Sequence, residues 1–200
     1  MNFTKKYLEE VIQITKKIDD TLIEKVINHL KSVKKAGGRI FFLGVGGSAG
    51  NASHAVNDFR KIVEIESYAP TDNVSELTAR TNDEGFSEIF SEWLKISKLN
   101  SKDLLFIFSV GGGNEEKNIS VNLIKAIKYS KEVNAKSISI LGKDNGYAAK
   151  NTDVAIIIPT IDPDRITPHS EGYQAVIWHL IVSHPELKTK NTKWESVEKK

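Results

Sequence analysis

Hydrophobic residues recur at helical spacing through the first part of the chain. Between residues 5 and 36 they fall on one face of a helix, at Leu8, Val11, Ile12, Ile18, Leu22, Val26, Leu30 and Val33. Lys34 and Lys35 occupy the last turn of this pattern, and Gly37-Gly38 ends it. The spacing predicts either one long helix or a broken pair of helices within residues 1–36.

Four short apolar runs alternate with helical patterns in the rest of the chain. The runs predict strands at 40–43, 104–108, 137–141 and 154–158. Helical spacing predicts helices over about 50–63, 74–81, 86–97, 120–134 and 171–183, with a short one after Gly146. Residues 159–168 contain three of the five prolines, which predicts an extended or looped segment. Strands that alternate with helices indicate an α/β fold, a doubly wound parallel sheet flanked by helices. We expect one domain over residues 1–200, ending in a polar tail at 188–200.

A glycine-rich turn joins the first predicted strand to the following helix. Residues 44–48 read GVGGS. Glycines let backbone N–H groups approach a ligand, and the helix N-terminus adds partial positive charge, so this turn can bind phosphate. It lacks the lysine of a P-loop and the spacing of GxGxxG, which favours a monophosphate over a nucleotide. The alternative is a turn that only packs the helix closely against the strand.

A second glycine-rich loop, SVGGGN at residues 109–114, follows the strand predicted at 104–108. In a parallel α/β sheet, ligands bind at the carboxyl ends of the strands, where both loops would lie. We therefore expect the two loops to share one ligand.

Composition and charge narrow the class of protein. The 28 Lys and Arg residues against 26 Asp and Glu give a net charge of +2, with both signs spread along the chain, which argues against a nucleic-acid partner. The absence of cysteine excludes disulfides and thiolate metal sites and fits a reducing compartment. No segment approaches the roughly 20 apolar residues of a membrane span, and acidic residues interrupt the N-terminus. We expect a cytoplasmic protein with no membrane partner.

Two pairs of residues suggest chemistry. His54 and Asp58 are four apart on a predicted helix, so their side chains project from one face beside the first glycine loop. Glu171 and His179 lie on the last helix, roughly 80° apart around its axis. Two histidines and two carboxylates can ligate a divalent ion such as zinc. The alternative is a locally hydrogen-bonded histidine and an ordinary surface carboxylate.

These motifs, in this order, resemble a known family. The first loop with His54 and Asp58, the Asn82-Asp83 pair, the second loop, LGKDNG at 141–146, Asp164-Arg165-Ile166 and WHLI at 178–181 resemble a sugar isomerase (SIS) domain of the phosphoheptose isomerase type. The resemblance implies a homotetramer with active sites between subunits. It also implies conversion of sedoheptulose 7-phosphate to a heptose 7-phosphate, for activated heptose and surface polysaccharide, and in many members zinc.

The resemblance also implies roles for individual residues. Asp58 and His179 fall at the acid and base positions. His54, Asp58, Glu171 and His179 fall at the metal-binding positions. The remaining positions imply contacts to the substrate, and they are Val45, Gly46, Gly47, Ser48, Asn82, Asp83, Ser109, Val110, Gly111, Asn114, Asp164 and Glu171.

The chain departs from the family at several of these positions. Val45 stands where the family has Asn, Asp58 where it has Glu, and Glu171 where it has Gln. The second loop has fewer hydroxyls than usual and an apparent insertion, so phosphate binding would depend more on backbone amides. The extra residues in TPHSEG give His169 a possible place at the pocket edge. These departures leave the exact sugar open.

Three functions follow from these observations. The first is a sugar-phosphate aldose-ketose isomerase. The second is a non-catalytic SIS protein that binds a sugar phosphate or another protein, as the replication-initiator-binding relatives do. The third is a lone domain of the hexosamine-phosphate isomerase type, which the absence of a partner domain for ammonia chemistry disfavours.

Overall fold

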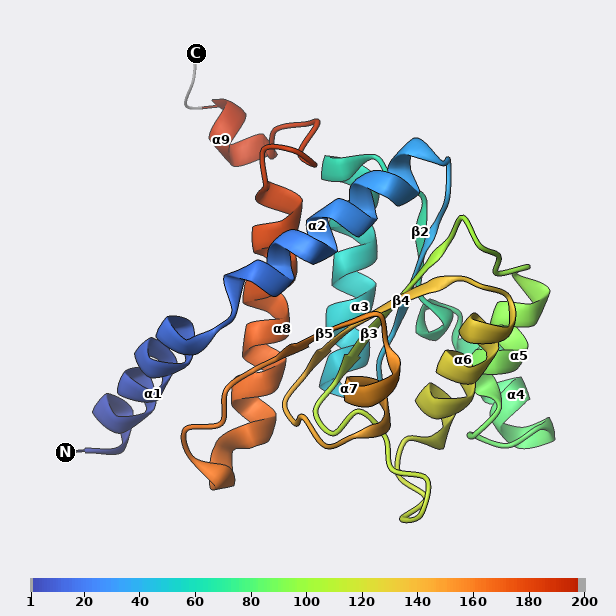
Figure 1. Ribbon diagram of the computed structural model, residues 1–200, viewed down its shortest axis with the longest axis horizontal. Helices are drawn as coiled ribbons and strands as arrows, with labels where there is room; N and C mark the ends of the chain where they lie inside the picture. Colours follow the sequence, from blue (N-terminus) through green and yellow to red (C-terminus); the bar gives the residue numbers. More distant parts are fainter. Residues whose placement is uncertain (1, 198–200) are drawn as a thin grey trace.

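In the computed structural model, which describes residues 2–197, five parallel strands form one sheet (Figure 1). The strands are β1 (Ile40–Leu43), β2 (Ser67–Tyr68), β3 (Leu104–Ser109), β4 (Lys136–Leu141) and β5 (Val154–Ile157). Their order is β2-β1-β3-β4-β5, and every neighbouring pair is parallel. The predicted doubly wound sheet is confirmed. The sequence did not reveal β2, because two residues are too few to form a pattern.

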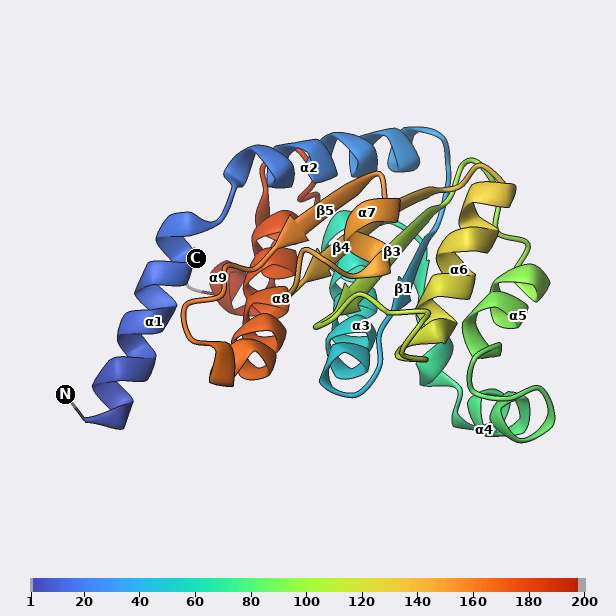
Figure 2. The same cartoon turned by 60° about the horizontal axis from the view of Figure 1, so that its bottom comes forward.

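Helices cover both faces of the sheet (Figure 2). One face carries α2 (Asp20–Lys35), α3 (Gly47–Asp58) and α8 (Ile166–Ser183), and the other carries α5 (Ile89–Ile96), α6 (Val121–Glu132) and α7 (Tyr147–Asn151).

Each face of the sheet has its own hydrophobic core. Phe41 and Phe42 are neighbours in β1, so their side chains point to opposite faces. Both are fully buried, Phe42 with Trp178 of α8 in one core and Phe41 with Leu123 of α6 in the other. Each side chain of this size contributes roughly 1.5–3 kcal/mol through burial, which fixes α8 and α6 against the sheet.

The N-terminal segment is a broken pair of helices, α1 (Phe3–Lys17) and α2. The break occurs because Ile18 is extended, with ψ 133°, and the Asp19 carboxylate accepts a hydrogen bond from the Thr21 amide at 3.0 Å, which caps α2. In Figure 1, α1 extends away from the sheet.

Several boundaries differ from the predicted ones. Helix α8 begins at Ile166 and includes Pro168 in its first turn, where the missing proline N–H costs no hydrogen bond. The prediction of an extended or looped segment through Pro168 is therefore wrong at its end, and Pro163–Arg165 forms a 3-10 turn. Helix α4 is Val74–Asp83, longer by two residues than predicted.

The predicted polar tail is structured over part of its length. Thr189 and Lys190 donate backbone hydrogen bonds to the carbonyl of Ile62, at 3.0 and 3.2 Å. A short helix, α9 (Lys193–Val197), follows. Residues 198–200 of the predicted tail lie outside the described residues.

A π-helical turn interrupts the helix predicted to run to residue 63. Helix α3 ends at Asp58, and Phe59–Val63 continues as the π turn, which stops at Glu64 with φ 58°. Single π turns occur frequently at functional sites. This one directly follows the candidate carboxylate Asp58.

None of the helices in residues 2–197 combines the length and the apolar character that crossing a bilayer requires.

Candidate active site

The packing of α3 against α8 brings His54, Asp58 and His179 together. Each residue offers one ligand atom, and these atoms lie within 4.8 Å of one another. Oδ2 of Asp58 is 3.8 Å from Nε2 of His179 and 4.0 Å from Nε2 of His54. The sequence could pair His54 with Asp58 by spacing, and the fold adds His179 from a distant helix.

Hydrogen bonds orient two of these groups. Nδ1 of His179 lies 2.8 Å from the carbonyl oxygen of Ala175, which can only accept, so Nδ1 carries the hydrogen and Nε2 of the neutral ring has a free lone pair. Asn57 donates to Oδ1 of Asp58 at 2.8 Å, which leaves Oδ2 for the histidines. The His179 side chain is 49% exposed and therefore accessible to a ligand.

The donor set fits a divalent metal ion. Two imidazoles and one carboxylate are ligand types of catalytic zinc sites, which keep a further position for water or substrate. The separations of 3.8 and 4.0 Å exceed hydrogen-bond lengths, so the three groups are not bonded to one another. The His54 ring packs edge-on against the buried ring of Trp178 at 4.7 Å, which holds it beside the other two.

Glu171, the fourth predicted metal ligand, is not part of this group. It precedes His179 by eight residues, which is about 12 Å along the helix axis. Its carboxylate lies against the first glycine loop instead, because a Cβ built on Gly47 would stand only 2.4 Å from its Oε2. The structure thus places the Glu171 carboxylate at the first glycine loop.

Two amide side chains that sequence reasoning missed join α3 to α8 near Glu171. Nδ2 of Asn51 donates to the carbonyl oxygen of Glu171 at 2.9 Å and to Oε1 of Gln174 at 3.0 Å. Gln174 is fully buried, and its Nε2 has no hydrogen-bond partner among residues 2–197. Amide side chains are common on helix surfaces, so their spacing in the sequence does not reveal that they join two helices.

The first glycine loop turns sharply into α3. Gly46 has φ 64°, a conformation that favours glycine, and its carbonyl accepts from the amides of Ala49 and Gly50. Val45 is 40% exposed, whereas Ser48 is almost fully buried. The loop can therefore offer a ligand its surface at Val45, and it packs its serine inward.

The second glycine loop is folded on itself. Oγ of Ser109 accepts a hydrogen bond from the backbone amide of Gly112 at 3.0 Å. Asn114 and Ile119 exchange two backbone hydrogen bonds of 2.9 Å, which form a small antiparallel bridge. The amides of Gly112 and Asn114 are thus occupied within the loop. Val110 and Gly111, which were predicted to contact the substrate, lie between them and β3.

Three further predicted residues lie away from the histidine cluster. Asn82 and Asp83 end α4, beside α5 on the far side of the sheet (Figure 2), and the Asn82 amide donates to the Asp83 carboxylate. Asp164 lies in the 3-10 turn before α8. The structure of the single chain does not bring these three to His179.

A separate polar cluster ties α1 to the start of α8. The carboxylate of Glu10 accepts from Arg165 at 2.8 and 2.9 Å and contacts Nε2 of His169 at 2.9 Å. Glu10 and His169 are buried. The hydrogen bonds from Arg165, and then from His169, lower the pKa of Glu10 to about 2. The ring of His169 is thus an internal partner of Glu10, and its expected place at a pocket edge stays a prediction.

Comparison with known proteins now decides the family. The SIS domain family matches residues 6–142, which is more than half of the chain. This chain belongs to the SIS domain family. The SIS protein is 29% identical over 167 residues to the phosphoheptose isomerase of Helicobacter pylori, covering 81% of this chain and 79% of that one. Its fold matches that of the phosphoheptose isomerase GmhA from Neisseria gonorrhoeae with a TM-score of 0.75 at 23% identity, covering 90% and 92% of the two chains.

A third relative of the SIS protein is considerably longer. The lincomycin biosynthesis protein LmbN of Streptomyces lincolnensis is 33% identical over 160 residues, covering 74% of this chain and 56% of LmbN. The SIS protein thus spans little more than half the length of that relative. Together these matches identify an SIS protein of the phosphoheptose isomerase type and support sugar-phosphate isomerase chemistry.

Proposed function

We propose that this SIS protein converts sedoheptulose 7-phosphate to a heptose 7-phosphate, as the first step toward activated heptose for surface polysaccharide. The observation that carries the proposal is the juxtaposition of the Asp58 carboxylate with Nε2 of His179 in an accessible position, while Nδ1 of that ring is directed at the Ala175 carbonyl. An aldose-ketose isomerase needs one group that moves a proton between carbons and one that moves a proton between oxygens.

The residues have the following roles in the proposed reaction. Asp58 removes the proton from the hydroxyl-bearing carbon beside the carbonyl and returns it to the former carbonyl carbon. Nε2 of His179 takes the hydroxyl proton and delivers it to the other oxygen, so that an enediol forms and collapses to the aldose with no net change in atoms or electrons. The half-exposed His179 ring gives the sugar access to both groups.

His54, Asp58 and His179 are the residues that would hold zinc or another divalent ion. When bound, the ion would polarise the sugar carbonyl and stabilise negative charge on its oxygen. Glu171 is proposed to contact the substrate from its position at Gly47, and Asn82, Asp83 and Asp164 to contribute from outside the cluster.

We further propose that the protein assembles as a homotetramer whose subunits complete the active sites. Val176 and Leu180 flank His179 on α8 and are 53% and 44% exposed. Phe3, Leu8 and Ile12 expose a similar apolar stripe on α1. Contiguous exposed apolar patches are typical of a surface that a second chain covers.

The experiment is proton NMR of sedoheptulose 7-phosphate with the purified protein in heavy water, with and without zinc. The expected result is an aldose that carries deuterium at the carbon beside its carbonyl. Chelator-treated protein is expected to lose turnover and to regain it with zinc, if the cluster holds the ion. Asp58→Asn and His179→Ala serve as the inactive controls.

The alternative, a non-catalytic SIS protein, requires no carboxylate and histidine in this arrangement. Absence of turnover on sedoheptulose 7-phosphate and on phosphorylated hexoses, together with tight binding of any of them, would favour that alternative.

A further inference from the structure

A cavity of about 240 Å³ lies between the second glycine loop and the loop that follows β4. One wall is formed by Gly111, Gly113 and Asn114, and the other by Lys143 and Asn145. Both loops leave the carboxyl ends of neighbouring parallel strands, where α/β proteins bind ligands. The cavity has room for several waters, since one water takes roughly 30 Å³ in the liquid.

Backbone contacts fix the two loops relative to each other. The amides of Tyr147 and Ala148 donate to the carbonyl oxygens of Gly113 and Gly112, at 2.9 and 2.8 Å. Gly146 packs so closely that a Cβ built there would lie 2.0 Å from the carbonyl oxygen of Gly111. These contacts join the two loops at the cavity floor.

Part of the backbone at the cavity floor is already hydrogen-bonded. The Gly112 amide is bonded to Ser109, the Asn114 amide to Ile119, and the Gly112 and Gly113 carbonyls are directed at α7. A phosphate monoester carries nearly two negative charges at pH 7. Cationic partners at this cavity would match the charge of that group, which the neutral amides of Gly111 and Gly113 cannot do alone.

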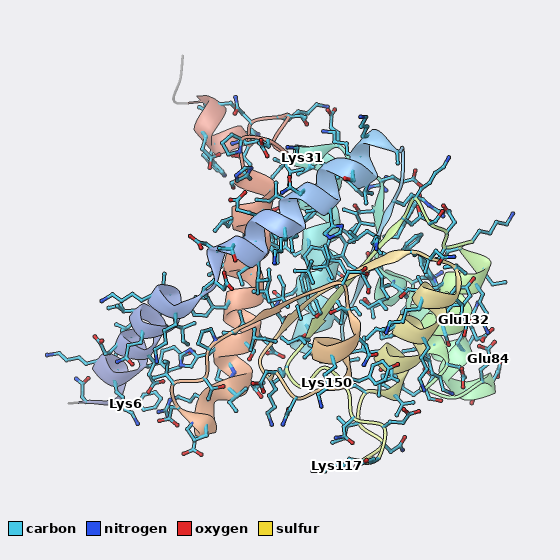
Figure 3. The ribbon with its side chains drawn as sticks, viewed as in Figure 1. Lys6, Lys31, Glu84, Lys117, Glu132 and Lys150 are labelled. Atoms are coloured by element: carbon cyan, nitrogen blue, oxygen red, sulfur yellow. The ribbon has the colours of Figure 1, made fainter. Side chains whose placement is uncertain are left out.

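Two lysines line this cavity from opposite loops, Lys117 and Lys143. Lys117 lies near the tip of the loop that follows β3 (Figure 3), and its amide donates to Oδ1 of Asn114 at 2.8 Å, within the Asn114–Ile119 bridge. Between residues 2 and 197, neither lysine ammonium has an ion-pair or hydrogen-bond partner, whereas nearby Glu115 is paired with Lys128 at 2.8 Å.

We propose that Lys117 and Lys143 form the subsite that binds the phosphate of the sugar phosphate. The proposal deepens the proposed function, on which it rests, and it replaces the hydroxyls that the second loop lacks with two ammonium groups. The neighbouring acids Glu116 and Asp144 are exposed and lie in the same loops, but the two lysines line the cavity and these acids do not.

The test uses calorimetric titration of the purified protein with inorganic phosphate at low ionic strength, which requires no turnover. Lys117→Met and Lys143→Met are each expected to weaken phosphate binding about tenfold, because a hydrogen bond to a charged group contributes roughly that factor. The double variant is expected to lose measurable binding, and the double arginine variant to retain it. Lys102→Met is the matched control, because this exposed lysine precedes β3 at the opposite edge of the sheet.

Kinetics then separate this proposal from the proposed function. If the protein turns over sedoheptulose 7-phosphate, the double methionine variant should raise KM far more than it lowers kcat. Unchanged phosphate affinity in that variant would overturn the lysine subsite, even with full isomerase activity. Lysine-dependent phosphate binding without turnover would support the subsite and leave the isomerase assignment wrong.

Discussion

His169 and His179 both lie on α8, yet their surroundings differ in burial and in hydrogen bonding. His169 is buried and contacts Glu10 at 2.9 Å, with Arg165 on the same carboxylate. His179 is half-exposed and stands 3.8 Å from Asp58. Buried ionisable groups must be paired to be tolerated, whereas a group that acts on a ligand must keep an unpaired atom. The first cluster therefore holds the fold, and the second is free for chemistry.

The largest expected effects, one on catalysis and one on stability, come from replacing His179 and His169 in turn. His179→Ala should lower kcat on sedoheptulose 7-phosphate by about 10²–10⁴-fold, the usual contribution of a proton-transfer group, and leave thermal stability unchanged. His169→Ala should lower the melting temperature by several degrees, because Glu10 loses a buried partner, and leave kcat near that of the wild type. NMR turnover and circular dichroism melting curves measure the two effects.

The opposite assignment of effects would break this comparison. Full activity in His179→Ala would show that the His179 cluster is not needed for catalysis. An unchanged melting temperature in His169→Ala would show that the His169 cluster does not stabilise the fold.

A smaller effect, on stability alone, is expected from Arg165→Met. This change leaves the Glu10 carboxylate with His169 as its remaining close partner and frees the start of α8 from α1. The melting temperature should fall by several degrees, and limited proteolysis should cut α1 sooner. Lys31→Met, which breaks the exposed Lys31–Glu186 pair, is the control and should have little effect.

Acid should gradually weaken the contacts of the Glu10 carboxylate with Arg165 and His169. The pKa of Glu10 is lowered from 4.5 to about 2 in the folded protein, so the unfolded chain binds the proton more readily. The stabilisation is complete above about pH 4.5 and is lost as the pH falls toward 2. Denaturant unfolding at several pH values should show a shallower acid loss in Glu10→Gln than in the wild type. Parallel curves for the two proteins would contradict the pairing.

The smallest effect is expected at the contact between Gly47 and Glu171. In Gly47→Ala the new Cβ meets the end of a flexible side chain, so Glu171 can move aside. A gain in helix propensity of up to about 1 kcal/mol offsets part of the cost, and stability should change little. Combining Gly47→Ala with Glu171→Ala should be more favourable than the sum of the single changes, as a double-mutant cycle by denaturant unfolding would show.

The sequence predicted those parts of the fold and site that depend on local periodicity. The apolar runs around Phe42 and Phe106 identified buried strands, and spacing of four placed His54 beside Asp58. The partner of His169 could not be predicted in this way, because Glu10 lies on α1, and only the packing of α1 against α8 brings the two together. The direction of the Glu171 side chain, toward Gly47, likewise depends on how α3 and α8 cross.

The contact between Gly47 and Glu171 makes the residue tolerated at one of these positions depend on the residue at the other, although the two are far apart in the chain. A side chain at position 47 and a long carboxylate at position 171 compete for the same space. A lineage that replaces the glycine is therefore expected to shorten the residue on α8 soon afterwards, or to have done so beforehand. Among descendants of this chain, substitutions at positions 47 and 171 should therefore occur together.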